Sequence, residues 1–312
     1  LTEGFNNSAF APKSLYYNTT GTRNVAFGTT ALFSNTTASE NSAFGCNSLF
    51  YSTGAGNVAA GYGSGWNVTT GTYNVIMGWR AAGGNNSAGT AALSGNYNVA
   101  LGYRAGYVLS TALDNTLIGR DAAVSLTTGN SNVIIGGTTA QALVSGSSNV
   151  FVGNQSGQIY TGSYMIAIGS QALSSNVNAT LATAVGHQSL RLSTAAGNSA
   201  FGYQSGNVLT TGANNSIFGS SAGGTVGGSQ NCMFGRAATT GASVNFAVVM
   251  GDSATASGDN GIAIGQGASA GLNAIAIGKG ANAAARVGVA AGQDAAQLAI
   301  GSATAPVGTQ GD

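Results

Sequence analysis

Charge is scarce in this sequence. Only 5% of the 312 residues are charged, and the formal net charge is +1. A net charge so near zero lacks the excess of basic residues typical of nucleic-acid-binding proteins, so no nucleic-acid partner is expected. No stretch approaches the roughly 18 consecutive apolar residues of a transmembrane helix, so we expect no membrane insertion in this segment.

Histidine, cysteine and proline are almost absent. His187 is the only histidine and has no acidic cluster beside it in the sequence, so no metal site is expected and a surface position is favoured. The 8 acidic residues are scattered, without the paired carboxylates of polysaccharide-cleaving enzymes. We therefore expect no enzyme, no catalytic residue and no cofactor. We assign no role to Cys46 or to His187.

Glycine is abundant, with 51 residues, and many of them close a repeated motif. The motif reads Asn24-Val25-Ala26-Phe27-Gly28 at its first clear occurrence. The closing glycines stand at positions 28, 45, 61, 78, 102, 119, 136, 153, 169, 186, 202, 219, 235, 251, 265, 278 and 301. Steps of 16 or 17 residues, shortening to 14 and 13, indicate a solenoid in which one repeat is one coil. The sequence predicts an all-β solenoid of about 17 coils.

The residues before each glycine alternate as a strand does. The residue just before the glycine and the one two positions earlier share one strand face, and the residue between them points to the other. Both faces are apolar, so both are expected to be buried. We expect the larger side chains, such as Phe27, to face the coil interior. The small middle residues are expected to contact other chains: Ala26, Ala43, Ala100, Ala200, Ala263 and Ala276.

Three further positions of the coil carry structural signals. Asparagine stands four residues before the glycine in eleven coils, and stacked asparagines can hydrogen-bond from coil to coil. The glycine is expected to provide a positive φ or a close backbone approach. A small residue three positions after the glycine, such as Ala31, is expected to begin a second short strand.

Changes in spacing divide the chain into four parts. Residues 1–28 form an opening coil in which Ala11 replaces the glycine. Residues 29–251 form the coils of 16 or 17 residues, with an inserted loop near 83–96. Residues 252–305 form shorter coils, and 306–312 are expected to be a frayed tail.

The repeats resemble two families of trimeric fibres. Gly261-Ile262-Ala263-Ile264-Gly265 and Ala274-Ile275-Ala276-Ile277-Gly278 are similar to head repeats of trimeric autotransporter adhesins, the YadA-like head. The longer coils, with Phe201-Gly202-Tyr203-Gln204-Ser205, resemble repeats of bacteriophage tail fibres. The resemblance implies a left-handed parallel β-roll that trimerises along its axis. It implies little about a ligand.

One stripe of side chains is a candidate binding site. Aromatic residues follow the glycine in three consecutive coils, and arginines lie beside them. Its members are Tyr62, Trp79, Arg80, Tyr103, Arg104 and Arg120. Exposed aromatic faces suit sugar rings, and arginine suits anionic sugars or phosphates. The alternative is an aromatic ladder that only covers the coil edges. Trp66 and Tyr73 lie nearby and fit either interpretation.

The function expected is that of a non-enzymatic fibre segment. The leading hypothesis is a phage tail fibre or similar virion appendage, a homotrimeric rigid shaft that also attaches to a cell-surface glycan or receptor and contacts other fibre proteins. The alternative is the head of a bacterial trimeric adhesin that binds host cells or matrix. A shaft without any binding role stays open. Ice binding also stays open, because β-solenoids with regular Thr arrays can bind ice, although the Thr pairs here, such as Thr36-Thr37, lie in turns. Either main hypothesis places the segment on a virion surface or otherwise outside the cell.

Overall fold

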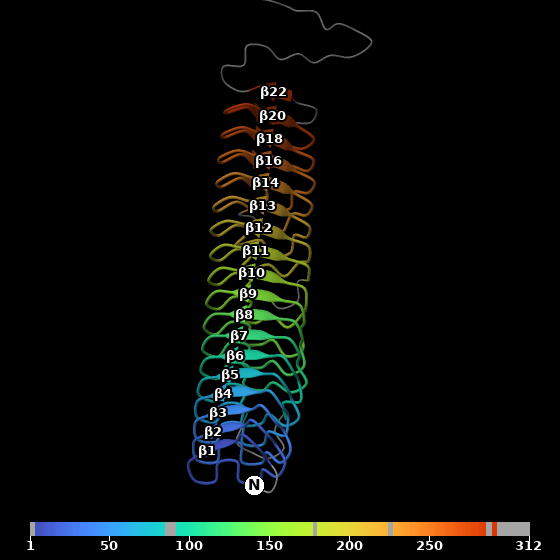
Figure 1. Cartoon of the computed structure of the whole chain (residues 1–312). Coiled ribbons are helices and arrows are strands. Elements are labelled where there is room, and N and C mark those ends of the chain that lie inside the picture. The colour runs from blue at the N-terminus through green and yellow to red at the C-terminus, as the bar shows by residue number, and fades with distance from the viewer. Residues whose placement is uncertain (1–3, 85–91, 177–179, 224–226, 285–288, 292–312) are drawn as a thin grey trace, which may run out of the picture.

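The chain folds as a β-solenoid of about 16 turns in which each coil stacks on the one before it (Figure 1). The computed structural model describes residues 4–84, 92–176, 180–223, 227–284 and 289–291. No helix occurs among these residues. The predicted all-β solenoid of parallel coils is confirmed.

One sheet runs the length of the stack, and each coil contributes a three-residue strand to it. Its eighteen strands are β1 (Ser8–Phe10), β2 (Val25–Phe27), β3 (Ser42–Phe44), β4 (Val58–Ala60), β5 (Val75–Met77), β6 (Val99–Leu101), β7 (Thr116–Ile118), β8 (Val133–Ile135), β9 (Val150–Val152), β10 (Ile166–Ile168), β11 (Thr183–Val185), β12 (Ser199–Phe201), β13 (Ser216–Phe218), β14 (Cys232–Phe234), β16 (Val248–Met250), β18 (Ile262–Ile264), β20 (Ile275–Ile277) and β22 (Val289–Ala291). All pairs are parallel and in register, so that Ala26 pairs with Ala43 and Phe27 with Phe44. Equivalent residues of the repeat therefore form rows along the stack.

A second sheet covers only the upper coils. Its four strands are β15 (Thr239–Thr240), β17 (Thr255–Ala256), β19 (Ser269–Ala270) and β21 (Asn282–Ala283). It begins in the coil closed by Gly235, one coil before the spacing shortens at Gly251.

The expected second strand is not formed after the closing glycines from Gly28 to Gly219 in the described part of the chain. In these coils non-glycine residues at the second and fourth positions after the glycine have positive φ, as at Thr30 (58°) and Leu32 (50°). A left-handed residue cannot continue an extended strand. At β17 the fourth position is Thr255, which is extended, and the strand forms there.

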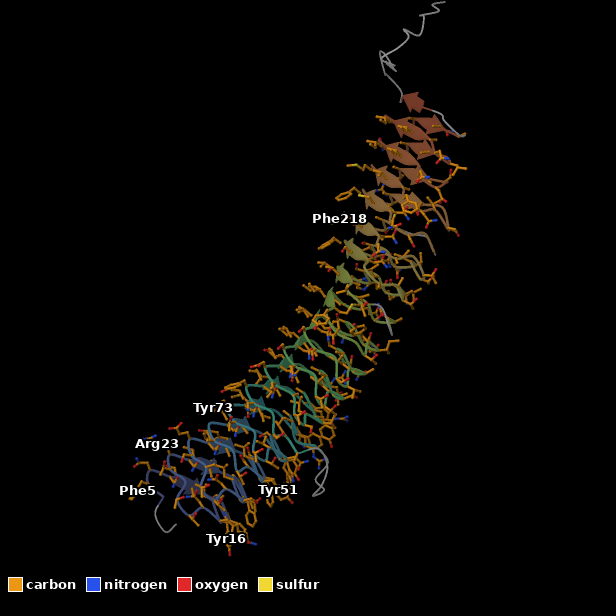
Figure 2. All side chains as sticks on the ribbon, turned by 90° about the vertical axis from the view of Figure 1, so that its right-hand side faces the viewer. Phe5, Tyr16, Arg23, Tyr51, Tyr73 and Phe218 are labelled. Carbon is orange, nitrogen blue, oxygen red and sulfur yellow. The ribbon has the colours of Figure 1, made fainter. Side chains whose placement is uncertain are left out.

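The two strand faces are assigned the opposite way from the expectation. The middle residues are buried inside their own chain: Ala26 is 1% exposed, and Ala43, Ala100, Ala200, Ala263 and Ala276 are 0% exposed. The larger side chains project outward, and Phe27 is 53% exposed. Phe218 is one of these outward side chains (Figure 2). The predicted contact of the alanines with other chains is therefore wrong, because no surface of theirs is left for a partner.

The narrow interior explains this reversal. Leucine occurs at the fourth position after the glycine where the strand residues of its own and the next coil are both alanine, as at Leu49 and Leu173. Where a strand residue is large, that position is glycine or alanine in every coil from Gly61 to Gly219. A Cβ on Gly157 would lie 2.8 Å from the Phe151 ring, and a Cβ on Gly106 would lie 2.7 Å from Leu117. Volume is thus shared between two rows of side chains inside the coil.

Asparagines line one corner of the interior as the predicted ladder. The backbone N–H of Asn41 donates to Oδ1 of Asn24 (3.0 Å), and the N–H of Asn57 donates to Oδ1 of Asn41 (2.9 Å). The Asn41 side-chain amide donates to the carbonyl of Gly54 (2.9 Å). Every one of the eleven asparagines is at most 2% exposed. The coil-to-coil hydrogen bonds are confirmed.

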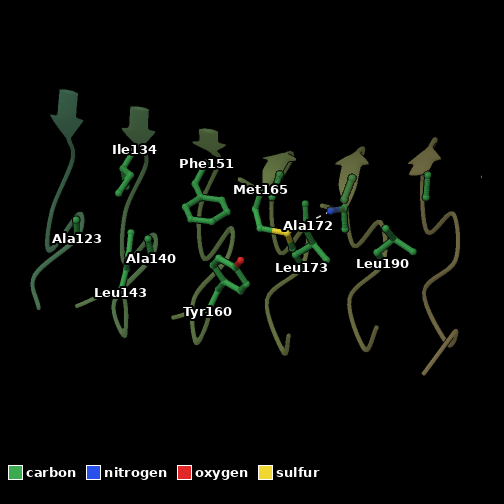
Figure 3. Packing of buried hydrophobic residues seen from close by; sticks show 14 of the residues in the cluster. Ala123, Ile134, Ala140, Leu143, Phe151, Tyr160, Met165, Ala172, Leu173 and Leu190 are labelled. Atoms are coloured by element: carbon green, nitrogen blue, oxygen red, sulfur yellow. Dashed lines mark hydrogen bonds between the residues drawn. The ribbon is translucent and has the colours of Figure 1, made fainter. Parts of the chain in front are cut away.

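The ladder changes chemistry at Met165 (Figure 3). The N–H of Met165 still donates to Oδ1 of Asn149 (3.0 Å), but Sδ of Met165 is the acceptor for the N–H of Ala182, at 3.4 Å. In the adjoining coils the two largest fully buried side chains, Phe151 and Tyr160, meet edge to face with their ring centroids 5.9 Å apart. The Tyr160 hydroxyl donates to the carbonyl of Ser163 (2.9 Å).

The closing glycines meet both expectations for them. Gly61 has φ 127°, and a Cβ there would lie 2.7 Å from the carbonyl oxygen of Gly78 in the next coil. Ala11, which replaces the glycine in the opening coil, has φ 129°, a conformation that alanine rarely adopts.

Parts of the predicted domain plan lie outside the described residues. The inserted loop near 83–96 falls mainly on residues 85–91, and after them Leu93 forms a parallel bridge with Val68. The frayed tail, 306–312, and the end of the short coils, 292–305, also lie outside.

Volume sharing in the interior predicts a rescue. Phe151→Ala is expected to lower the free energy of unfolding by about 3–5 kcal/mol because it leaves a cavity. Adding Gly157→Leu should restore much of this loss, since the new leucine would then lie between alanines as Leu173 does. Urea denaturation of the two single variants and the double variant measures the coupling. Additive losses in the double variant would contradict shared volume.

Burial raises the pKa of the Tyr160 hydroxyl to about 12 from 10.0. Because the folded pKa lies above the unfolded one, the stability linked to this proton is complete below pH 10 and is lost as the pH rises toward 12. Tyr160→Phe should therefore flatten the loss of thermal stability between pH 10 and 12. Tyr164→Phe, at a 66% exposed tyrosine, is the control and should leave the profile unchanged.

Candidate functional site

The predicted aromatic stripe is assembled in the structure. Tyr62, Trp79 and Tyr103 stand in one row, directly after the closing glycines of three successive coils. The ring centroids of Tyr62 and Trp79 are 6.4 Å apart and those of Trp79 and Tyr103 are 4.9 Å apart, with interplanar angles of 18° and 7°. We name this the post-glycine row. Each ring plane lies nearly parallel to the next, as the stacking of coils requires.

The three arginines lie beside this row, and two of them, Arg104 and Arg120, share one acid. The guanidinium carbon of Arg80 lies 4.7 Å from the centroid of the Trp79 ring. Arg104 Nε is 3.4 Å from Asp121 Oδ1, and Arg120 Nη1 is 3.1 Å from Asp121 Oδ2. Three cations and one carboxylate leave a local positive excess. The side chain of Arg120 is the most exposed of the ion-paired groups here, at 62%.

Stacking covers both ring faces of Trp79, the middle ring of this stripe, and leaves only its edge at the surface. Trp79 has Tyr62 on one face and Tyr103 on the other, and it is only 40% exposed. A sugar ring packs against an aromatic face. The stripe therefore offers arginine groups and ring edges, and its aromatic members act first as a ladder that covers the coil corner.

A second aromatic stack was missed at the level of the sequence. Tyr16, Phe33, Phe50 and Trp66 stand five residues after the closing position of four successive coils, and their rings stack with centroids 5.5, 4.9 and 5.0 Å apart. Its signal is the spacing of 17, 17 and 16 residues. Tyr51 meets this aromatic stack edge-on. Tyr16 and Tyr51 project on the other side of the solenoid from Phe218 (Figure 2). Trp66 thus belongs to this stack and not to the post-glycine row.

Tyr73 does not join the post-glycine row either. It stacks on Tyr97 with ring centroids 5.6 Å apart and an interplanar angle of 3°. Both lie five residues before a closing glycine, in a third row.

The outer strand face forms a further candidate surface. It consists of the first and third residues of each strand in the long sheet, and no strand from β1 to β20 of that sheet holds a charged residue. Phe201, Phe218 and Phe234 stack along it with centroids 4.8 and 4.5 Å apart. Phe234 is 40% exposed and Ile277 is 50% exposed. An apolar strip of this length on one chain is a candidate interaction surface.

The residues without a predicted role lie at the surface. His187 is exposed and stacks on Tyr203 with ring centroids 5.3 Å apart. Cys46 is exposed in the post-glycine row. Cys232 is half-buried on the outer strand face, the face that carries Phe27 and was expected to point into the coil. Within the described residues no three His, Cys, Asp or Glu side chains gather in a way that could hold a metal ion. The same residues include no helix of the length and apolarity needed to cross a membrane.

Comparison with known proteins adds no relative. No protein-family model matches the chain, and no curated protein sequence matches it.

Trp79 is stacked between two rings, so its removal is expected to destabilise the fold. Trp79→Ala should lower the free energy of unfolding by about 1–3 kcal/mol, since two ring stacks are lost. Tyr164→Ala is the matched control, because no ring contact of Tyr164 is found in the described part of the chain, and its effect should stay within about 0.5 kcal/mol. Equal effects of the two substitutions in urea denaturation would rule out the ladder role.

Proposed function

We propose that this chain is a segment of a rigid, non-enzymatic homotrimeric fibre, the shaft of a phage tail fibre or a similar virion appendage outside the cell. The observation that carries the proposal is the uncharged outer strand face, in which the third strand residues form a continuous apolar row. In this proposal it replaces the alanines as the contact between chains.

The outer strand face needs a cover for a general reason. Strands of a parallel sheet are usually buried on both faces. Here the chain covers the inner face with its own coil and leaves the outer face bare. A typical monomer exposes an apolar patch of at most about 300–600 Å². The uncharged strip here runs along eighteen strands, about 80 Å at roughly 4.8 Å per strand, so its exposed apolar side chains form one extended patch.

The number of chains comes from the resemblance and not from the strip itself. Repeats of both similar families form trimers about a threefold axis. Three strips facing one axis would bury each other and leave the other corners of the coil free. The physical role of such a body is reach, because the stacked coils place whatever lies beyond them at a fixed distance.

Attachment to a cell surface is the second candidate function. The excess of arginine around Asp121 favours it, since guanidinium groups bind phosphate and carboxylate in a bidentate way. The ligand class would be an anionic surface glycan, at Arg80, Arg104 and Arg120. The head of a bacterial adhesin that binds host cells or matrix is the alternative with the same architecture.

Light scattering tests the assembly. The native particle is expected at about 91 kDa, three times the chain mass of 30.4 kDa. Phe218→Asp should give 30.4 kDa particles, because it would place three carboxylates at one buried level of the axis. Gln230→Asp is the control, in an exposed row that already holds Glu40 and Asp114, and should stay trimeric. A 30.4 kDa wild-type particle would overturn the proposal.

The two cysteines give an independent readout of the same assembly. In the native wild type a thiol reagent should modify Cys46 quickly and Cys232 only after denaturation, since Cys232 lies on the outer strand face. In Phe218→Asp both should react. Equal rates in the wild type would mean that this face is free in solution.

A further inference from the structure

The post-glycine row holds a second aromatic pair, many coils away from the Tyr62–Arg120 stripe. His187 and Tyr203 stack with an interplanar angle of 10°. The pair is flanked in the row by Ser170 before it and Ser220 after it, as the strand register requires. Serine covers little of a ring, so Tyr203 presents one face toward Ser220. Tyr203 is 53% exposed, whereas Trp79, stacked on both sides, is 40% exposed.

The next residue of the row does not cover this face. It is Arg236, whose Nη2 donates to Oδ2 of Asp252 (2.7 Å) in the following coil. The hydrogen bond from Arg236 is the main reason that the pKa of the Asp252 carboxyl is lowered. The guanidinium is thus held toward Asp252, and no guanidinium lies over Tyr203 in the described part of the chain.

Polar groups without charge surround the open ring face. A ladder of glutamines runs beside the post-glycine row, in which Gln188 Nε2 donates to Gln171 (2.7 Å) and Gln204 Nε2 donates to Gln188 (2.8 Å). The ladder ends at Gln204, because Ser221 takes its place in the next coil. Gln204 is the first donor of this chain of bonds, and no hydrogen bond to its amide oxygen is found in the described part of the chain. Ser220 and Ser221 are both exposed and add two hydroxyl groups.

We propose that a neutral pyranose unit of a polysaccharide binds on the open face of Tyr203. Coils repeat at roughly 4.8 Å, so a sugar ring can occupy the level that the next ring of the ladder would take. The C–H face of the sugar packs on Tyr203, and its hydroxyl groups bond to Gln204, Ser220 and Ser221. The sugar is neutral because Arg236 and Asp252, the ion pair found nearby among the described residues, already neutralise each other. This site goes beyond the proposed fibre function and is separate from the arginine stripe.

Saturation-transfer difference NMR on the full chain tests the site. The probes are the methyl glycosides of glucose, galactose and N-acetylglucosamine. At least one is expected to bind the wild type. Ser220→Tyr should weaken that binding by about tenfold or more, since the new ring would complete the ladder and cover Tyr203. Tyr203→Ala should weaken it as strongly.

Ser170→Tyr is the matched control. It extends the same row on the other side of the pair, against His187, and should leave binding unchanged. Because both serine variants add a ring to a ladder, loss of the fold cannot explain a difference between them. Absence of binding to the wild type, or equal binding by Ser220→Tyr and Ser170→Tyr, would overturn the proposal. Neither result depends on the particle mass, so the sugar site can be disproved without disproving the trimer.

Discussion

In-register stacking of identical backbone positions is the constraint on which the rest of this structure depends. Each strand is only two or three residues long, too short to be stable alone, and it gains its partners from the coils on either side. The buried asparagines strengthen this contact, because each amide joins its neighbour's N–H and a turn carbonyl at once. A buried amide with few partners would destabilise the fold. Here the repeat provides the partners. At Met165 a sulfur replaces the asparagine oxygen as the acceptor of the next coil's N–H.

The narrowness of the coil then decides which side chains lie inside. Strand alternation establishes that Ala26 and Phe27 point in opposite directions, and this much follows from the sequence. Which of the two points inward does not follow from it, since hydrophobicity alone favours the phenylalanine. Up to Gly219 the interior holds an alanine opposite a leucine, or a large residue opposite a glycine or an alanine. Phenylalanine is therefore displaced outward, and a core strand acquires a second apolar face.

The period also predicted which side chains share a row, but not what a row exposes. Tyr62, Trp79 and Tyr103 are brought together as expected, because identical offsets from the glycine must stack. Parallel stacking nevertheless hides the faces of inner rings, and only the last ring of a stack keeps one open. Trp66 was placed by its nearness in sequence, although its offset assigns it to another row. In the coils up to Gly219 the second strand does not form for a local reason, the positive φ of residues such as Leu32. The sequence has no glycine there to signal that conformation.

The direction of the backbone hydrogen bonds has a mechanical consequence. The strands lie across the long axis, so the bonds between coils run along it. Sideways load on the stack is shared among many coils. Tension along the axis of a single chain acts instead on the bonds of one coil at a time, and each coil that opens leaves the next in the same position. A single chain of this kind is therefore stiff under sideways load but weak under tension along its axis.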